Sequence, residues 1–336
     1  MKTRNSVPSL ALRWVIVLVA ILVLAIAGIL IANRTIFSAQ HQVKVLQQHM
    51  AAGEGGKALG LLRASVPEGN AVALNGDVLK HTQEGITDFS VAPAVTDEHD
   101  SDLVEVKATY QAEGTEHSST YRLHRAGKSW LFFDQWEFVP DSLPTIQVRA
   151  NTVNEVSLNK EKIPLDQGIS TIPVFYPAVI NASFETKNFK ADTRGVVVTG
   201  PTKDPVPVKL TTEPTKAFLS AINKKLKTYV DGCASQKVLM PAGCPMAYHT
   251  SARVNSQSIN WTITDYPKAK VSYYNGAWVL APLEFEAQLQ LTEQDLRTGA
   301  TEKKTVKETY NFTAQLTTST TKVSVVPVAA VENAAN

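Results

Sequence analysis

The hydrophobic positions of the chain begin with an unbroken apolar run close to the N-terminus. Trp14 to Ala32 read WVIVLVAILVLAIAGILIA, without a charged side chain. A helix rises 1.5 Å per residue, so this run would span roughly 28 Å, close to the ~30 Å thickness of a bilayer's hydrocarbon core. Because only a helix satisfies its own backbone hydrogen bonds in lipid, residues 14–32 are predicted to form a transmembrane helix.

The charges beside this run predict its orientation. Lys2, Arg4 and Arg13 precede it, with no acidic residue among them. The positive-inside rule then places residues 1–13 in the cytoplasm as a short tail. We therefore expect a single-pass protein of the cell membrane whose bulk is extracytoplasmic.

A cleaved signal peptide is the alternative to an anchor. Ala25-Ile26-Ala27 has the small residues of a cleavage site. The apolar run continues past that point for several residues, which a mature N-terminus would leave exposed. This continuation favours an uncleaved anchor, with the lipid bilayer as the partner of residues 14–32.

After the apolar run the spacing becomes helical and then alternating. Ser38 to Arg63 carries apolar residues at helical spacing on both sides of a Gly-rich break. Leu103 to Ala112 alternates, which is typical of a strand with one buried face. Residues 120–139 are expected to form a hairpin around a turn at Gly127. Residues 38–141 are thus predicted to be a domain of helices packed on an antiparallel sheet.

Residues 142–210 are rich in Val, Thr and Pro and carry only short runs. The runs predicted as strands are Ile146–Ala150, Glu155–Leu158, Thr171–Tyr176, Ala178–Glu185 and Gly195–Thr199. Short strands without a helical pattern are typical of a small β-sandwich, which is the fold expected here. Gly200 to Pro207 is rich in proline and is expected to be a linker or an edge.

Residues 211–326 open with a helical pattern. The expected helix, TKAFLSAINKKLKTYV, follows Pro214, with Thr212 or Glu213 as its start signal. Its apolar stripe consists of Phe218, Ile222, Leu226 and Tyr229.

Strands are expected after this helix. Their ranges are Ser258–Thr264, Ala269–Tyr274, Ala277–Leu280, Leu283–Leu291 and Lys303–Leu316. Asn275-Gly276 lies between two of them and is a strong signal for a tight hairpin turn. The chain is expected to fray from Val323, with residues 327–336 as a flexible tail.

The two cysteines agree with an extracytoplasmic location. Cys233 and Cys244 are eleven positions apart and are flanked by glycine and proline. On the predicted topology both lie in an oxidising compartment, where such a pair indicates a local disulfide. Metal binding with His249 is the alternative, but the two cysteines lack C-x-x-C spacing and a fourth ligand is not evident.

Residues 38–141 and 211–326 share a plan that indicates a degenerate internal repeat. Each opens with a helix and continues as strands, with a glycine shortly before a tryptophan at Gly127–Trp130 and at Gly276–Trp278. A helix on a curved antiparallel sheet with such hairpins resembles the NTF2-like or cystatin-like domains. An α+β fold with two such domains, separated by the small all-β domain, is therefore expected.

The order of these parts also resembles a known family. An anchor, an NTF2-like domain, a small β domain and a second NTF2-like domain are similar to the teicoplanin-resistance-associated membrane proteins. The loop from Asp231 to Pro245 resembles loops in membrane proteins of actinobacteria. The resemblance implies a bacterial cell-envelope protein but carries over no functional residue, and residues 1–13 lack that family's Cys-rich zinc ribbon.

Charge and motifs argue against several function classes. The formal net charge of +2 is concentrated at the N-terminus, so the outer part is near neutral and nucleic acid is not an expected partner. The acidic run Asp97–Asp102 lacks the pattern of a calcium loop and is expected to be a solvated turn. Ser157 and Lys160 match S-x-x-K without its companion motifs. We expect no metal, no cofactor and no catalytic residue.

Aromatic side chains gather in residues 211–326 and are the candidate site. The candidate pocket residues are Trp261, Tyr266, Tyr273, Tyr274, Trp278 and Phe285. They are expected either to form the domain core or to line a ligand pocket. The sequence favours a non-enzymatic envelope scaffold or binding module with an envelope protein or cell-wall partner. The alternative is an envelope hydrolase or ligand-binding enzyme that uses this pocket.

Overall fold

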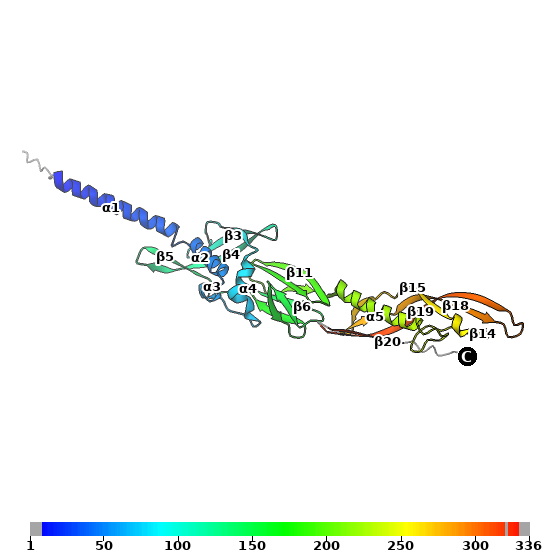
Figure 1. Ribbon diagram of the computed structural model, residues 1–336. Coiled ribbons are helices and arrows are strands. Elements are labelled where there is room, and N and C mark those ends of the chain that lie inside the picture. Colours follow the sequence, from blue (N-terminus) through cyan, green and yellow to red (C-terminus); the bar gives the residue numbers. More distant parts are fainter. Residues whose placement is uncertain (1–8, 320–321, 329–336) are drawn as a thin grey trace, which may run out of the picture. The chain divides into compact units, whose positions relative to one another are not determined.

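The computed structural model describes residues 9–319 and 322–328 of the chain (Figure 1). These residues divide into two compact units. The first unit extends to Leu210, except for Phe184–Asp192, and the second unit combines Phe184–Asp192 with the chain from Thr211 onward. The predicted division of the outer part into three domains stays a prediction.

The N-terminal helix α1 (Ser9–Arg34) is apolar and is not covered by the rest of the protein. Its segment Leu12–Arg34 has the length and composition of a membrane-crossing helix. Large side chains such as Leu18 and Leu24 are exposed along it. The helix is therefore compatible with a membrane span or a signal anchor. Lys2 and Arg4 lie outside the described residues.

Short helices follow α1 in the first unit. They are α2 (Ala39–Ala51), α3 (Gly55–Leu62), the 3-10 turn η1 (Ala71–Leu74) and α4 (Gly76–Gln83). Ser38 caps α2 by accepting a hydrogen bond from the backbone N–H of His41. Val43 and Leu46 bury the inner face of α2. These helices confirm the helical pattern and its Gly-rich break, while α4 was not predicted.

An antiparallel sheet packs against these helices. Its strands are β1 (Thr87–Val91), β2 (Val95–Thr96), β3 (Leu103–Ala112), β4 (Thr115–Ser129) and β5 (Phe133–Phe138). The order is β1-β3-β4-β5, with β2 also beside β3. The bounds of β3 match the predicted strand, and its buried residues alternate as the sequence indicates.

The predicted turn at Gly127 is wrong. Gly127 lies inside β4, where it pairs with Gln135 next to a register shift, and its φ of 133° suits an irregular strand position. The β4–β5 hairpin turns instead at residues 130–132. The extra residue of the bulge lengthens β4, so the strand continues beyond the glycine that the sequence analysis took as its end.

Residues 145–214 form strands. These are β6 (Thr145–Ala150), β7 (Glu155–Leu158), β8 (Glu161–Pro164), β9 (Ile169–Pro173), β10 (Ala178–Glu185), β11 (Phe189–Val198), β12 (Val206–Leu210) and β13 (Glu213–Pro214). One sheet has the order β13-β11-β10-β7-β8 and another has β12-β6-β9. Residues 206–210 are thus an edge strand that pairs in parallel with β6, so Val206 and Pro207 belong to the edge that was one of the two expectations for residues 200–207.

The second unit contains the helix α5 (Lys216–Ala234). Thr215 is its N-cap, in place of the predicted Thr212 or Glu213, because its side chain accepts from the Phe218 N–H. The buried stripe contains Phe218, Ile222 and Leu226 as predicted and continues with Val230. The remaining predicted stripe residue, Tyr229, is half-buried.

Strands complete the second unit. They are β14 (Arg253–Val254), β15 (Asn260–Asp265), β16 (Val271–Tyr274), β17 (Ala277–Leu280), β18 (Leu283–Gln294), β19 (Thr301–Thr318) and β20 (Val323–Val328), with the 3-10 turn η2 (Ser256–Ser258) before β15. The main sheet has the order β14-β18-β19-β20, and β15 also pairs with β18.

The β16–β17 turn agrees with the sequence prediction, whereas the C-terminal strand does not. Asn275 and Gly276 form the β16–β17 turn with positive φ at both residues, which confirms the predicted tight hairpin. Val323–Val328 is a strand paired with β19, so the predicted fraying from Val323 is wrong. Val323 and Val325 are half-buried along this strand, and residues 329–336 lie outside the described residues.

The protein is therefore a mixed α+β chain with an apolar N-terminal helix and curled sheets that are antiparallel except for the β6–β12 pair (Figure 1). The NTF2-like assignment of residues 38–141 and 211–326 stays a prediction. The glycine–tryptophan element of the predicted repeat differs between the two regions. Gly276 makes a hairpin turn before Trp278, whereas Gly127 lies within a strand and Trp130 is itself in the turn.

Candidate binding site beside the disulfide loop

The predicted disulfide between Cys233 and Cys244 is present and anchors an ordered loop. Cys233 is buried near the C-terminal end of α5, and the loop that follows carries Cys244 back to it. The Tyr229 hydroxyl donates to the Gly243 carbonyl at 2.7 Å, and the Trp261 indole N–H donates to the Val238 carbonyl at 2.8 Å. The helix and strand β15 thus hold the loop at separate points.

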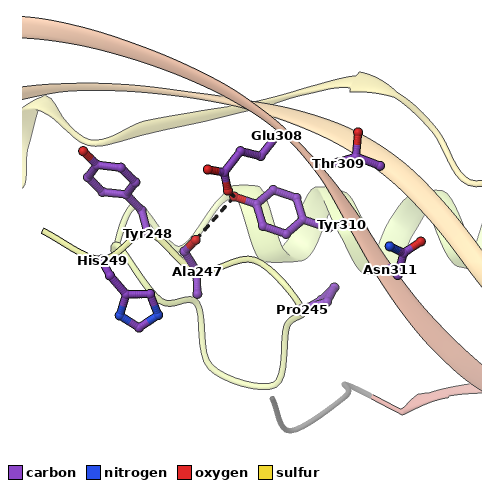
Figure 2. Close-up of a pocket in the computed structure, with 8 residues that line it drawn as sticks. All are labelled: Pro245, Ala247, Tyr248, His249, Glu308, Thr309, Tyr310 and Asn311. Carbon is purple, nitrogen blue, oxygen red and sulfur yellow. Dashed lines mark hydrogen bonds between the residues drawn. The ribbon is translucent and has the colours of Figure 1, made fainter. Parts of the chain in front are cut away.

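A cavity of about 530 Å³ lies between this loop and strand β19 (Figure 2). Its lining residues are Pro245, Ala247, Tyr248 and His249 from the loop and Glu308, Thr309, Tyr310 and Asn311 from β19. The cavity is within the size range of small-molecule sites. The loop wall of the cavity begins at Pro245, directly after Cys244. The disulfide to Cys233 therefore helps to hold this wall opposite strand β19.

Tyr310 is the central polar group of this pocket. Its hydroxyl lies 3.0 Å from the Glu308 Oε2 atom and 3.4 Å from the Ala247 carbonyl oxygen, and it points toward both in Figure 2. Burial and the Glu308 carboxylate raise the pKa of the Tyr310 hydroxyl far above its usual range. The phenol therefore stays protonated at physiological pH and acts as a hydrogen-bond donor.

Tyr248 is fixed on the opposite wall. Its hydroxyl donates to the Glu293 Oε1 atom at 2.9 Å, and the Lys304 ammonium lies 5.6 Å from the centre of its ring. Burial raises the pKa of Glu293, but hydrogen bonds from Thr250 and Tyr248 and the charge of Lys304 outweigh it, so the pKa is lowered. Glu293 thus stays ionised and keeps Tyr248 in place.

The six predicted aromatic residues do not line this pocket. Trp261 and Phe285 are buried in the core, with ring centres 6.1 Å and 5.7 Å from that of Tyr310. They support the pocket from behind without reaching its surface. Tyr266 lies elsewhere, where its hydroxyl donates to Asp231 at 2.9 Å beneath the Lys227 ammonium.

The other predicted aromatics belong to the β16–β17 hairpin. Trp278 is half-buried and stacks on Phe189, with ring centres 4.7 Å apart. Tyr273 packs edge-on against Trp278, and Tyr274 is 72% exposed. The structure therefore places two of the six residues in the core, Tyr266 beside α5 and the other three on this hairpin.

The sequence analysis missed Glu308, Tyr310 and the loop residues beside them. Glu308 and Tyr310 lie two positions apart on β19, and the alternation continues to the buried Phe312. This alternation shows which side chains share a face. It could not show that the disulfide loop would lie opposite that face.

Other motifs take part in local structure. Asp97 accepts from the backbone N–H of His99 at 2.8 Å, so this part of the acidic run forms a hydrogen-bonded turn. Lys160 pairs with Glu84 at 2.8 Å rather than with Ser157, which lies in strand β7. Among the described residues, no group of three or more His, Cys, Asp and Glu side chains is placed to hold a metal ion.

Comparisons with known proteins give no relative from which the role of the site could be inferred. No protein-family model, no curated protein and no solved structure matches this chain. The resemblance to the teicoplanin-resistance-associated membrane proteins therefore stays an expectation drawn from the order of the domains. The pocket, the disulfide loop and the apolar helix are the features that a functional account has to explain.

Proposed function

We propose that this chain is a membrane-anchored protein of the cell envelope whose extracytoplasmic part is a binding module without catalytic activity. The observation that carries the proposal is α1, a helix of membrane-crossing length and composition that the rest of the protein leaves uncovered. Transfer of such an apolar surface into lipid is strongly favourable. The resemblance to the teicoplanin-resistance-associated membrane proteins belongs to the same proposal.

The orientation rests on charge and on the disulfide. Arg13 lies at the N-terminal side of the apolar segment, and the positive-inside rule favours a cytoplasmic N-terminus. The chain after Arg34 is then extracytoplasmic. Disulfides persist in that compartment, and the bond between Cys233 and Cys244 agrees with it.

The chemistry of the pocket supports binding rather than turnover. A tyrosine that acts as a base needs a lowered pKa, whereas the pKa of Tyr310 is raised. The Glu308 carboxylate accepts the Tyr310 hydrogen bond. Together with Asn311 and His249, these groups suit a polar ligand that is recognised by hydrogen bonds, such as the carbohydrate or peptide of a cell wall.

A fractionation experiment tests the anchor. The full chain, expressed in bacteria, should remain in the membrane pellet after extraction at high pH, which removes peripheral proteins. A Leu18→Lys/Leu22→Lys variant puts two charges into the apolar helix and should release protein into the soluble fraction. Release of the wild-type chain by the same extraction would contradict the anchor.

A sedimentation experiment tests the binding module. Detergent-solubilised full chain should sediment with insoluble purified cell wall, and Tyr310→Ala should reduce the bound fraction several-fold. Tyr274→Ala is the control because this exposed residue lies on the separate β16–β17 hairpin. Equal sedimentation of Tyr310→Ala and the wild type would contradict a ligand site in the pocket.

A further inference from the structure

The tip of the β4–β5 hairpin is an exposed apolar surface in the first unit. Trp130, Leu131 and Phe132 are 84%, 81% and 52% exposed, respectively. Large apolar side chains at this exposure in consecutive positions are unusual on a soluble surface. A hairpin tip would ordinarily carry polar residues or glycine.

The backbone holds these side chains outward at a conformational cost. Trp130 and Leu131 have φ angles of 53° and 69°, in the left-handed region that bulky residues rarely adopt. The β16–β17 turn of the same protein uses Asn275 and Gly276 for such angles. Bulky apolar residues at strained turn positions point to a function for their side chains.

Helix α1 fixes the place of the tip. Asn33 donates from its amide nitrogen to the Phe132 carbonyl at 2.9 Å and accepts from the Asp134 N–H at 3.2 Å. Phe37, one turn further along the chain, stacks on Phe133 with ring centres 4.4 Å apart. The hairpin is thus clamped beside the C-terminal end of α1, as Figure 1 also shows for β5.

These contacts place the hairpin turn beside the end of the apolar segment. Moving back along the chain from Phe37 to Asn33 leads toward the apolar segment of α1. Asn33 bonds to Phe132 and to Asp134, on either side of Phe133, so the residue next to the apolar segment lies at the turn end of β5. Trp130 and Leu131 therefore lie on the side of the apolar helix and away from the buried end of β5 at Phe138.

We propose that the Trp130–Phe132 tip inserts into the membrane–water interface beside α1, as a second contact with the same bilayer. This inference rests on the proposed function, in which α1 crosses the membrane. Asn33 is the first polar residue after the apolar run, so the tip is placed at the boundary of the hydrocarbon core. Tryptophan and phenylalanine favour this zone, and the exposed Lys128 and Arg34 beside it suit lipid phosphates.

The consequence is a fixed orientation of the first unit on the membrane. A transmembrane helix alone leaves the attached domain free to tilt and rotate about its linker. The tip and the Asn33 clamp provide a second point of attachment close to the helix. Together they hold the helices and sheet of the first unit at the lipid surface.

Site-specific fluorescence on the reconstituted full chain tests this inference. An environment-sensitive NBD label on Leu131→Cys, in vesicles of phosphatidylcholine and phosphatidylglycerol, should emit blue-shifted light. Spin-labelled lipids should quench it, and aqueous iodide should quench it little. Glu116→Cys is the matched control, because this exposed residue lies at the other end of the same strand β4. Its label should emit at longer wavelength and be quenched by iodide.

A third label separates this inference from the proposed anchor. Leu22→Cys lies in the middle of α1 and reports whether the helix enters the bilayer. If this label is quenched by lipid and the Leu131→Cys label behaves like the Glu116→Cys label, the anchor stands and the tip inference is wrong. If the Leu22→Cys label is also accessible to iodide, the anchor itself is wrong. A Leu131→Cys label shielded from both quenchers would mean that protein covers the tip, which also overturns the inference.

Discussion

At the scale of single residues, two tyrosines are buried together in the first unit. Tyr121 is fully buried and donates its hydroxyl hydrogen to the Tyr176 carbonyl at 2.8 Å. The two rings stack with centres 5.2 Å apart. Burial is the main reason that the pKa of each hydroxyl is raised, and for Tyr176 it is raised to about 12. Both tyrosines thus resist ionisation in the folded state but not in the unfolded chain.

This difference predicts an alkaline loss of stability. A raised pKa in the folded state contributes stability that is present below pH 10 and is lost as the pH rises from 10 to 12. Tyr176→Phe removes this ionisation, so its unfolding free energy should fall less steeply over that range, by roughly 1 kcal/mol per pH unit. Denaturant titrations at pH 8, 10 and 11 measure the slopes. Parallel slopes for the variant and the wild type would show that Tyr176 ionises alike in both states.

The cap of α5 gives a second prediction at this scale. The Thr215 hydroxyl accepts from the Phe218 N–H at 3.1 Å and donates to the Lys187 carbonyl at 2.7 Å. Thr215→Ala should lower the unfolding free energy by about 1 kcal/mol, because the helix N-terminus loses its acceptor. Thr215→Ser retains the hydroxyl and should stay close to the wild type in the same denaturant titration. A Ser variant as unstable as the Ala variant would assign the effect to the lost methyl group instead.

The disulfide loop is the element on which the candidate pocket depends. The loop supplies Pro245, Ala247, Tyr248 and His249, while β19 supplies the opposite wall. The bond between Cys233 and Cys244 links the loop to the end of α5. Without the bond, the remaining attachments are hydrogen bonds such as that between Trp261 and Val238.

Removal of the disulfide should therefore affect stability and pocket together. Closing a loop of this length contributes roughly 3 kcal/mol in the chain-entropy view. A Cys233→Ser/Cys244→Ser variant should unfold at a lower denaturant concentration, and its binding to cell wall should weaken as Tyr310→Ala does. The single Ser variants, kept reduced, serve as controls for the serine side chains. A double variant with unchanged stability would show that the hydrogen bonds alone hold the loop.

The sequence predicted those elements whose side-chain alternation ends at clear turn residues. The bounds of β3, β7, β10 and β17 agree with the predicted ranges. The sequence left β12 open between a linker and an edge and missed β20, because their proline- or alanine-rich surroundings resemble a linker and a tail. Their pairing with β6 and β19 is a long-range interaction that local composition cannot show.

The candidate site was less predictable than the fold. The cysteine pairing followed from spacing and the expected compartment, whereas none of the six aromatic candidates lines the pocket beside the disulfide loop. Aromatic content indicates burial but does not indicate which rings share a surface. The Trp130–Phe132 turn was hidden by Gly127, since a glycine before a tryptophan suggests a turn and here accommodates a bulge.

At the scale of the whole molecule, the proposal combines an anchor, a membrane-facing first unit and a second unit that carries the pocket. The described residues form two compact units, and α1 belongs to the first of them. The hydrogen bonds of Asn33 and the stack of Phe37 tie α1 to strand β5. Helix α1 and the rest of the first unit are thus attached by side chains as well as by the chain itself.

Two reporter fusions show on which side of the membrane the chain continues after α1. Alkaline phosphatase, which is active only outside the cytoplasm, and green fluorescent protein, which fluoresces in the cytoplasm, are each fused after Gln40. The account predicts an active phosphatase fusion and a dark fluorescent fusion. An inactive phosphatase together with a fluorescent second fusion would place the outer part in the cytoplasm and contradict the account.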